Sequence, residues 1–184
     1  MGGHLLIGML APLLVASAYP IPLLMRTLTV TSARRVMRWM RQPYVNLVTD
    51  PIVSTLLNIG SLWALYTTDL YGTMHGSEAI HILVHIHFFL SGYVWTSSVL
   101  DSTPVAHRNR YTYRLIALIL AIAGHSILAK YLYGSPPNGV PIEQAEEGAM
   151  LMYYGGDAVE AVLMAILCYR LYRSMVWLRM IKIT

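Results

Sequence analysis

Five apolar stretches, separated by polar or charged segments, account for most of the chain. A helix needs about 20 mostly apolar residues to cross the hydrocarbon core of a membrane, and each stretch has about this length. Lipid cannot satisfy exposed backbone groups, so we expect these stretches to be helices. The pattern predicts an all-α, polytopic membrane bundle of about five transmembrane helices, forming one domain over residues 1–184. The predicted spans are residues 3–25, 46–67, 79–100, 112–133 and 148–169.

The first of these spans is the least regular. Pro12, Pro20 and Pro22 lie within it, and a proline bends a membrane helix where it removes a backbone hydrogen bond. A cleavable signal peptide is the alternative, because residues 16–18, Ala-Ser-Ala, have the small side chains of a cleavage site. The segment before them lacks Lys and Arg, however, and the apolar run continues to Met25. We therefore favour a bent first span.

The composition and the distribution of charge indicate a membrane protein with a defined orientation. The 184 residues are 56% hydrophobic and 12% charged, with a mean hydropathy of +0.52, which is more apolar than a soluble domain. In the five-span arrangement, twelve of the thirteen basic residues fall on one side, and Lys130 alone falls on the other. Basic connections stay in the cytoplasm, so we expect the N-terminus outside and the C-terminus in the cytoplasm. The net charge of +4 reflects this topology, and nucleic acid is not an expected partner.

A short amphipathic segment follows the first span. Residues 31–42, TSARRVMRWMRQ, place Arg34, Arg38 and Arg41 on one helical face, with the apolar side chains largely away from it. Such a helix is typical of a membrane surface, where its charged face contacts water and headgroups and its apolar face contacts lipid. We predict a short interfacial helix near residues 31–42, on the inner leaflet.

Three histidines interrupt the third span, which reads IHILVHIHFF over residues 80–89. His81 and His85 are four residues apart and share a helix face, which is the spacing at which two imidazoles can reach one metal ion. His87 lies about 200° around the helix from His85. We expect His87 to make a structural hydrogen bond instead, as polar side chains often do between membrane helices.

Polar groups from three spans are expected at a common depth in the outer half of the membrane. At about 1.5 Å per residue, His85 and His125 both lie roughly 9–12 Å below the outer surface. Asp157 of the fifth span lies about 13 Å below the same surface, with Glu160 one turn deeper. A charged group at this depth costs roughly 2.5–3.5 kcal/mol and needs a partner. We therefore expect the two carboxylates to support the histidines by fixing their tautomers.

Further histidines and methionines complete the candidate metal site. His4 opens the first span at the outer edge, and His75 lies in the outer loop beside Met74. Methionines are usually core residues, but a thioether near the outer boundary also suits cuprous ion, which prefers soft ligands. The predicted metal ligands are His81, His85, His125, His4 and His75, and the predicted supporting residues are Asp157, Glu160, Met74, Met150 and Met152.

The residues alone leave other functions open. We find no nucleophile–base pair at usable spacing and no phosphate-binding loop, so an enzyme is not expected. One alternative is a membrane redox protein in which His85 and His125 bind a haem as axial ligands. A copper or proton transporter is less favoured, because the inner halves of the spans offer few polar groups beyond Asn58 and Ser91. A structural scaffold without a bound cofactor is a third alternative.

Five segments of the sequence resemble a known family along most of the chain. They are GHLLIGMLAPLL (3–14), GSLWALYTTDLYGTMH (60–75), IHILVHIHFFLSGYVW (80–95), GHSILAKYLYG (124–134) and EQAEEGAMLMYYGGDAVE (143–160). The similarity is to the polytopic bacterial cytochrome c oxidase assembly factors called CtaG. The family pattern His-x3-His-x-His-Phe is matched in the third span by His81, His85, His87 and Phe88.

The resemblance implies a function in maturing a haem–copper respiratory oxidase in the bacterial plasma membrane. It implies a multi-pass protein that holds copper at the outer face and supplies it to cytochrome c oxidase subunits, and a homo-oligomer is compatible with this function. His4 and His125 match histidines of the family. Two positions depart from it: the usual Asp-Gln reads Glu143-Gln144, and the usual Met-Trp reads Leu151-Met152. Because many relatives have more spans, additional helices before this start are also compatible with the family.

Overall fold

The structure is a computed structural model that describes residues 2–102, 110–137 and 139–181, without the side chains of His75 and of residues 177–181. The regular elements within these ranges are helices, which confirms the all-α part of the predicted fold class. In chain order they are η1 (His4–Leu10), α1 (Ala11–Ser17), α2 (Pro20–Thr27), α3 (Val30–Met40), α4 (Pro43–Val48), α5 (Pro51–Thr67), α6 (Leu70–Gly76), α7 (Glu78–Leu100), α8 (Tyr111–Gly134) and α9 (Ile142–Ile181).

Three of the described helices are long and apolar enough to cross a membrane: α7, α8 and the Ile142–Val176 part of α9. A fourth span is obtained if His4–Ser17 and α2 count together, because they meet at a break where the chain bends by 48°. At this break Tyr19 has a left-handed φ of 53°, so the predicted bend in the first span is observed. The described part of the chain therefore does not support the predicted count of five spans.

The second predicted span shows why the count differs. Residues 46–67 divide between α4 and α5 instead of forming one helix. The Asp50 carboxylate accepts hydrogen bonds from the backbone N–H groups of Ile52 and Val53, at 3.0 and 3.2 Å, and this cap starts a new helix. The resulting α5 has 17 residues, at the short limit for a membrane helix. Which end of the bundle faces outside stays a prediction.

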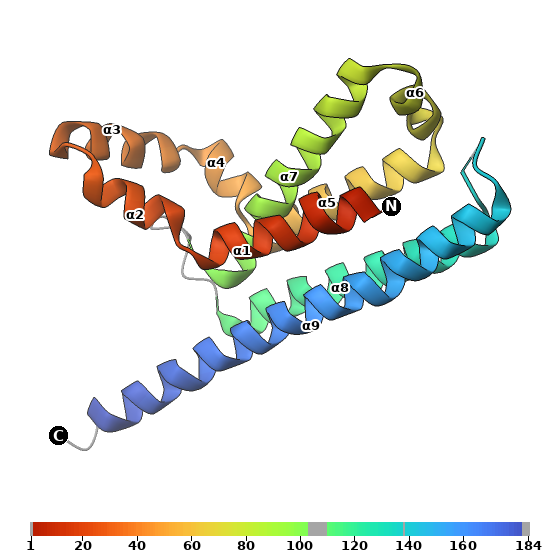
Figure 1. Cartoon of the computed structure of the whole chain (residues 1–184). Helices are drawn as coiled ribbons and strands as arrows, with labels where there is room; N and C mark the ends of the chain where they lie inside the picture. The colour runs from red at the N-terminus through yellow and green to blue at the C-terminus, as the bar shows by residue number, and fades with distance from the viewer. Residues whose placement is uncertain (1, 103–109, 138, 182–184) are drawn as a thin grey trace.

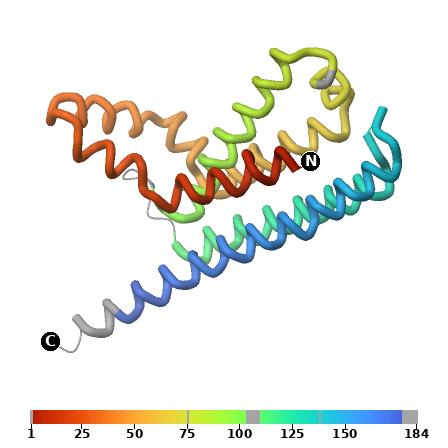
Figure 2. The backbone as a smooth tube through the Cα atoms, in the orientation of Figure 1, coloured from red at the N-terminus to blue at the C-terminus, as the bar shows by residue number. Residues whose placement is uncertain are grey.

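The helices are arranged in two layers with a projecting arm (Figures 1 and 2). α8 and α9 run antiparallel, side by side, while η1, α1, α5 and α7 form the other layer. α2, α3 and α4 form the arm, which extends away from the α8–α9 pair beyond the end of α1. The helix predicted near residues 31–42 is observed as α3, and its position on a membrane surface stays a prediction.

Apolar packing and a few polar contacts hold the two layers together. The apolar residues form two clusters, one including Leu62, Leu65, Phe88, Leu128, Leu132 and Met152, the other Leu13, Trp95, Val99, Leu118, Leu163 and Leu167. Between α5 and α7, the Trp95 indole N–H donates to the Thr55 hydroxyl at 2.9 Å. The Ser54 and Ser98 hydroxyls are hydrogen-bonded at 2.7 Å. Such polar contacts stabilise helix pairs in lipid, where apolar burial alone gives little driving force.

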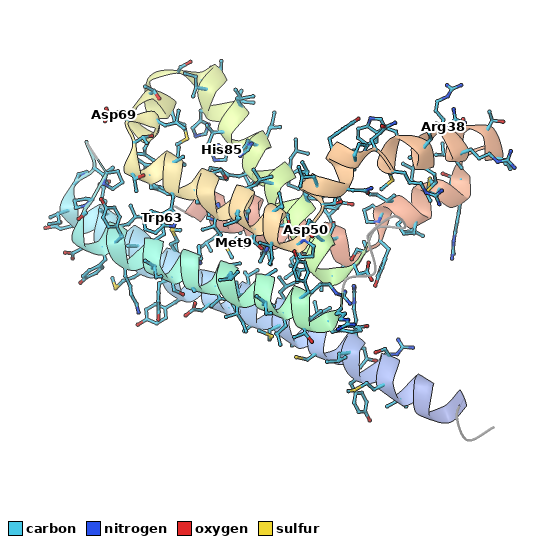
Figure 3. All side chains as sticks on the ribbon, turned by 180° about the vertical axis from the view of Figure 1, so that it is seen from behind. Met9, Arg38, Asp50, Trp63, Asp69 and His85 are labelled. Carbon is cyan, nitrogen blue, oxygen red and sulfur yellow. The ribbon has the colours of Figure 1, made fainter. Side chains whose placement is uncertain are left out.

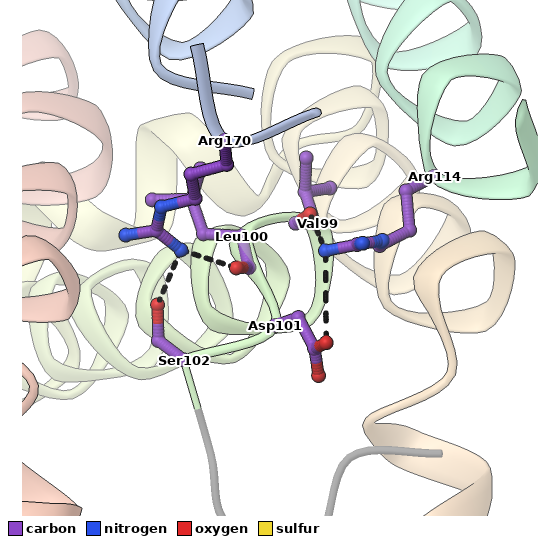
Figure 4. Close-up of polar contacts among 6 residues, drawn as sticks. All are labelled: Val99, Leu100, Asp101, Ser102, Arg114 and Arg170. Carbon is purple, nitrogen blue, oxygen red and sulfur yellow. Dashed lines mark hydrogen bonds and ion pairs between the residues drawn. The ribbon is translucent and has the colours of Figure 1, made fainter. Parts of the chain in front are cut away.

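Two arginines from other helices hold the C-terminal end of α7 (Figure 4). Arg114 of α8 donates to the Val99 carbonyl at 3.3 Å and lies 3.8 Å from the Asp101 carboxylate. Arg170 of α9 donates to the Leu100 carbonyl. The last carbonyls of a helix have no partner within it and carry partial negative charge, so guanidinium groups stabilise this end.

η1 and α7 approach each other closely at two glycines. Gly92 of α7 lies against the backbone carbonyl of Gly8, so a Cβ at position 92 would overlap the carbonyl oxygen. Small residues of this kind let the backbones of membrane helices approach each other. The approach brings the start of η1 to α7, where the His4 ring lies with its centroid 5.3 Å from that of Phe88.

Gly92→Ala is expected to destabilise the fold by about 1–3 kcal/mol, because the overlapping atom belongs to the backbone and cannot rotate aside. Gly60→Ala in α5 is the matched control, since a Cβ there meets nothing within 4 Å. Unfolding of the purified variants in detergent micelles measures both effects. Equal stability of the two variants would contradict the close contact between η1 and α7.

Candidate functional site

A pocket of about 260 Å³ lies where the start of the chain, α5, α6 and the first turns of α7 meet. Figure 3 shows His85 on α7, in the angle between this helix and the α5–α6 segment. Four of the predicted site residues line this one pocket: His4, His81, His85 and Met74. Its other lining residues are Gly3, Leu65, Tyr66, Tyr71, Val84 and Phe88.

His81 and His85 form a close pair on α7. Their ring centroids are 4.3 Å apart, as their spacing of one helical turn predicts. His85 Nδ1 lies 2.8 Å from the backbone carbonyl oxygen of His81. Because a carbonyl only accepts hydrogen bonds, Nδ1 carries the proton in the neutral ring, and the lone pair on Nε2 is free. This nitrogen faces the N-terminal segment: a Cβ on Gly3 would lie 3.2 Å from it.

Met74 and Tyr71 of α6 line the same pocket as the histidine pair. Met74 is buried and lines the same pocket as the two imidazoles, and a thioether is a donor that soft metal ions accept. Burial raises the pKa of the Tyr71 phenol above its ordinary value, so Tyr71 stays protonated at neutral pH. An uncharged phenol is not an anionic ligand. Sequence reasoning missed Tyr71, because one tyrosine in a short apolar helix gives no spacing signal.

His4 lies between this pocket and a second polar group deeper in the bundle. Its ring centroid is 6.0 Å from that of His125 in α8. His125 Nδ1 in turn lies 3.8 Å from the nearer carboxylate oxygen of Glu160, beyond hydrogen-bonding distance. The three side chains are 5%, 1% and 2% exposed, respectively. Among the described residues, neither ring nitrogen of His4 or His125 has a hydrogen-bond partner, nor has the second oxygen of Glu160.

Glycines make room for the two buried rings. A Cβ on Gly8, one turn after His4, would lie 2.6 Å from His4 Nδ1, and a Cβ on Gly156 would overlap the His125 ring. The segment that carries His4 is a π-helix, a wide and rare helix type that is frequent at functional sites. The glycine that follows His4 by four residues is a signal that sequence reasoning missed.

The other predicted site residues lie away from the pocket. Met150 is exposed on α9, and Met152 is fully buried in an apolar cluster. Asp157 does not line the pocket, and one of its carboxylate oxygens lies 3.5 Å from the Ser126 hydroxyl. The side chain of His75 lies outside the described residues. The structure therefore brings together one methionine and three histidines of the predicted set, with His125 and Glu160 behind His4.

The described residues contain no group of three or more His, Cys, Asp or Glu side chains close enough to hold a metal ion. The layer of polar groups expected from the sequence is divided instead into an outer pair, His81 and His85, and an inner pair, His125 and Glu160, with His4 between them. Two imidazoles beside a thioether suit a soft ion of low coordination number better than a hard ion. Metal binding itself stays a prediction.

Comparison with known proteins assigns the chain to a family. The family model described as cytochrome c oxidase caa3 assembly factor matches residues 1–174. An uncharacterized protein of Mycobacterium leprae is 25% identical over 133 residues, which cover 68% of this chain and 20% of the relative. An uncharacterized protein of Mycobacterium tuberculosis is 26% identical over 133 residues, with the same shares covered. The chain thus spans about a fifth of the length of these relatives, and no solved structure matches it.

The match to the family model extends from the first residue to the last turns of α9. It includes the helix that carries the His81–His85 pair and both segments that carry the buried histidines. The resemblance first indicated by the histidine pattern of the third span is confirmed. The chain belongs to the family of cytochrome c oxidase caa3 assembly factors.

Proposed function

We propose that this chain binds cuprous ion in the pocket lined by His81, His85 and Met74 and supplies it to a haem–copper cytochrome c oxidase during assembly. The family membership supports the assembly function. The observation that carries the copper proposal is the hydrogen bond from His85 Nδ1 to the His81 carbonyl, which leaves Nε2 unprotonated in the pocket. The oxidase subunits are the proposed partners, and the bacterial plasma membrane is the proposed location.

The donor set of the pocket supports retention of copper without permanent capture. Two imidazoles and one thioether are ligands that cuprous ion accepts. Three donors leave the coordination of the cuprous ion incomplete. A ligand from a recipient protein can therefore bind the ion before the imidazoles and the thioether leave it. His81 is exposed and His85 half-buried, which keeps the outer side of the pocket accessible. The distribution of basic residues supports an orientation in which this end of the bundle faces outside.

His4 is the fourth member of the proposed site, and His125 and Glu160 position it. The His4 ring lines the pocket on one side and contacts the His125 ring on the other. Because His125 and Glu160 are both buried, a substitution at Glu160 acts on the position of His4 through the His125 ring. These two residues are therefore positioning residues, whereas His81, His85 and Met74 are the proposed ligands and His4 lines the same pocket.

Replacing His81 and His85 together by Asn should reduce bound cuprous ion at least about tenfold, because both imidazole ligands are lost. Oxidase activity in cells should fall together with the amount of bound copper, and it should recover when copper is supplied in excess. His87→Asn is the control, because His87 is exposed and does not line this pocket. Copper content and the visible spectrum of the protein purified without chelator are the measurements. Unchanged copper in the double variant would overturn the proposal, and a stoichiometric Soret band would indicate haem instead.

Met74→Leu should weaken the binding of cuprous ion while leaving zinc binding unchanged, because zinc sites use thiolate, imidazole and carboxylate ligands rather than thioethers. Leucine has a similar volume, so the fold should lose less than about 1.5 kcal/mol of stability. Met150→Leu is the control, since Met150 lies on the exposed face of α9. Competition with a cuprous chelator measures the affinity. An equal loss of affinity in both variants would exclude Met74 as a ligand.

A double-mutant cycle tests the contact between His125 and Glu160. His125→Leu and Glu160→Leu should each destabilise the fold, because each leaves a buried polar partner behind. The double variant should be less destabilised than the sum of the two, with a coupling of about 0.5–3 kcal/mol. A second cycle between Glu160→Leu and Arg35→Gln, on separate elements, serves as the control and should be additive within about 0.5 kcal/mol. Additive effects at His125 and Glu160 in detergent unfolding would show that the pair is not coupled.

A further inference from the structure

The arm formed by α2, α3 and α4 carries a concentration of positive charge that the proposed function does not use. Five arginines lie between residues 26 and 41, and residues 26–49 contain no Asp or Glu. In the described part of the chain, none of the five makes an ion pair or a side-chain hydrogen bond. Figure 3 labels Arg38 on this arm, far from His85. The charge therefore belongs to a separate surface from the histidine pocket.

Three of these arginines line a large pocket between α2 and α3. The pocket has a volume of about 820 Å³ and is lined by Arg34, Arg38 and Arg41. Apolar side chains also line it and include those of Met25, Leu28, Val30 and Met37. Arg26 and Arg35 lie on the same arm but do not line it. Cationic and apolar side chains thus line the same pocket.

We propose that this pocket binds an anionic phospholipid of the surrounding membrane. Guanidinium groups bind phosphate oxygens through paired hydrogen bonds, which suits Arg34, Arg38 and Arg41 to a phosphodiester headgroup. The apolar side chains accommodate the beginning of an acyl chain. A free phosphate ion uses only the arginines, so the combination of both kinds of side chain favours a lipid. Clusters of basic residues on an amphipathic helix beside a membrane span are the usual form of such lipid sites.

The position of the arm supports a lipid as the ligand. α2 continues directly from η1 and α1, which together with α2 are apolar enough to cross a membrane as a broken span. Trp39 and Tyr44 on the arm are 60% and 55% exposed. Aromatic side chains of this kind gather at the boundary between lipid and water. The pocket therefore lies next to a segment that is apolar enough to enter the membrane.

The test compares two variants that each remove two charges, Arg34→Gln with Arg38→Gln inside the pocket and Arg26→Gln with Arg35→Gln outside it. The full chain is reconstituted in nanodiscs of phosphatidylcholine with added phosphatidylglycerol, then released into detergent. Native mass spectrometry counts the phosphatidylglycerol retained. The wild type and the outside variant should retain it, whereas the pocket variant should retain about tenfold less. Glutamine keeps helix propensity, and circular dichroism checks that both variants remain folded.

Three outcomes would overturn the proposal. An equal loss of retained phosphatidylglycerol in the two variants would indicate diffuse attraction between a basic arm and an anionic surface. Equal retention of phosphatidylcholine and phosphatidylglycerol would exclude recognition of the headgroup charge. Displacement of the lipid by inorganic phosphate at comparable concentration would identify a free anion as the ligand. Copper content is measured in the same samples and should be the same in all of them, which separates this proposal from the copper proposal.

Discussion

The close contact of η1 with α7 is the constraint on which the candidate site depends. Gly8 and Gly92 allow two backbones to meet without side chains between them. As a result His4 reaches the helix that carries His81 and His85, and Gly3 lies beside the free nitrogen of His85. A wider separation would move His4 and Gly3 away from the histidine pair of α7. The site thus depends on the distance between η1 and α7 as much as on the number of histidines.

The local features of the fold were predictable because neighbouring residues determine them. The long apolar runs at 79–100 and 112–133 correspond within one residue to α7 and α8. The pairing of His81 with His85 follows from helical spacing in the same way. The division of residues 46–67 was missed, although Asp50 followed by proline is a helix start signal, because hydropathy averaged over a window hides a single capping residue.

The arrangement of the site could be predicted only in part, because it rests on contacts between distant segments. Counting residues along the spans placed His125 and His85 at a similar depth, but depth says nothing about direction around a helix axis. In the structure His4 separates the two groups, and Glu160 faces His125 rather than the outer pair. Gly156 gives space to the His125 ring. The direction in which this histidine points is thus set by a small residue on another helix, which the spacing of the polar residues does not indicate.

The arginine contacts at the end of α7 have a mechanical consequence. Arg114 and Arg170 attach the last turn of this helix to α8 and α9, whereas His81 is one turn from its opposite end. His81 and Leu100 are separated by about 28 Å of helix. A small rotation of α7 about its arginine-bound end would therefore displace the turns that carry His81 and His85 more than the turns near Leu100.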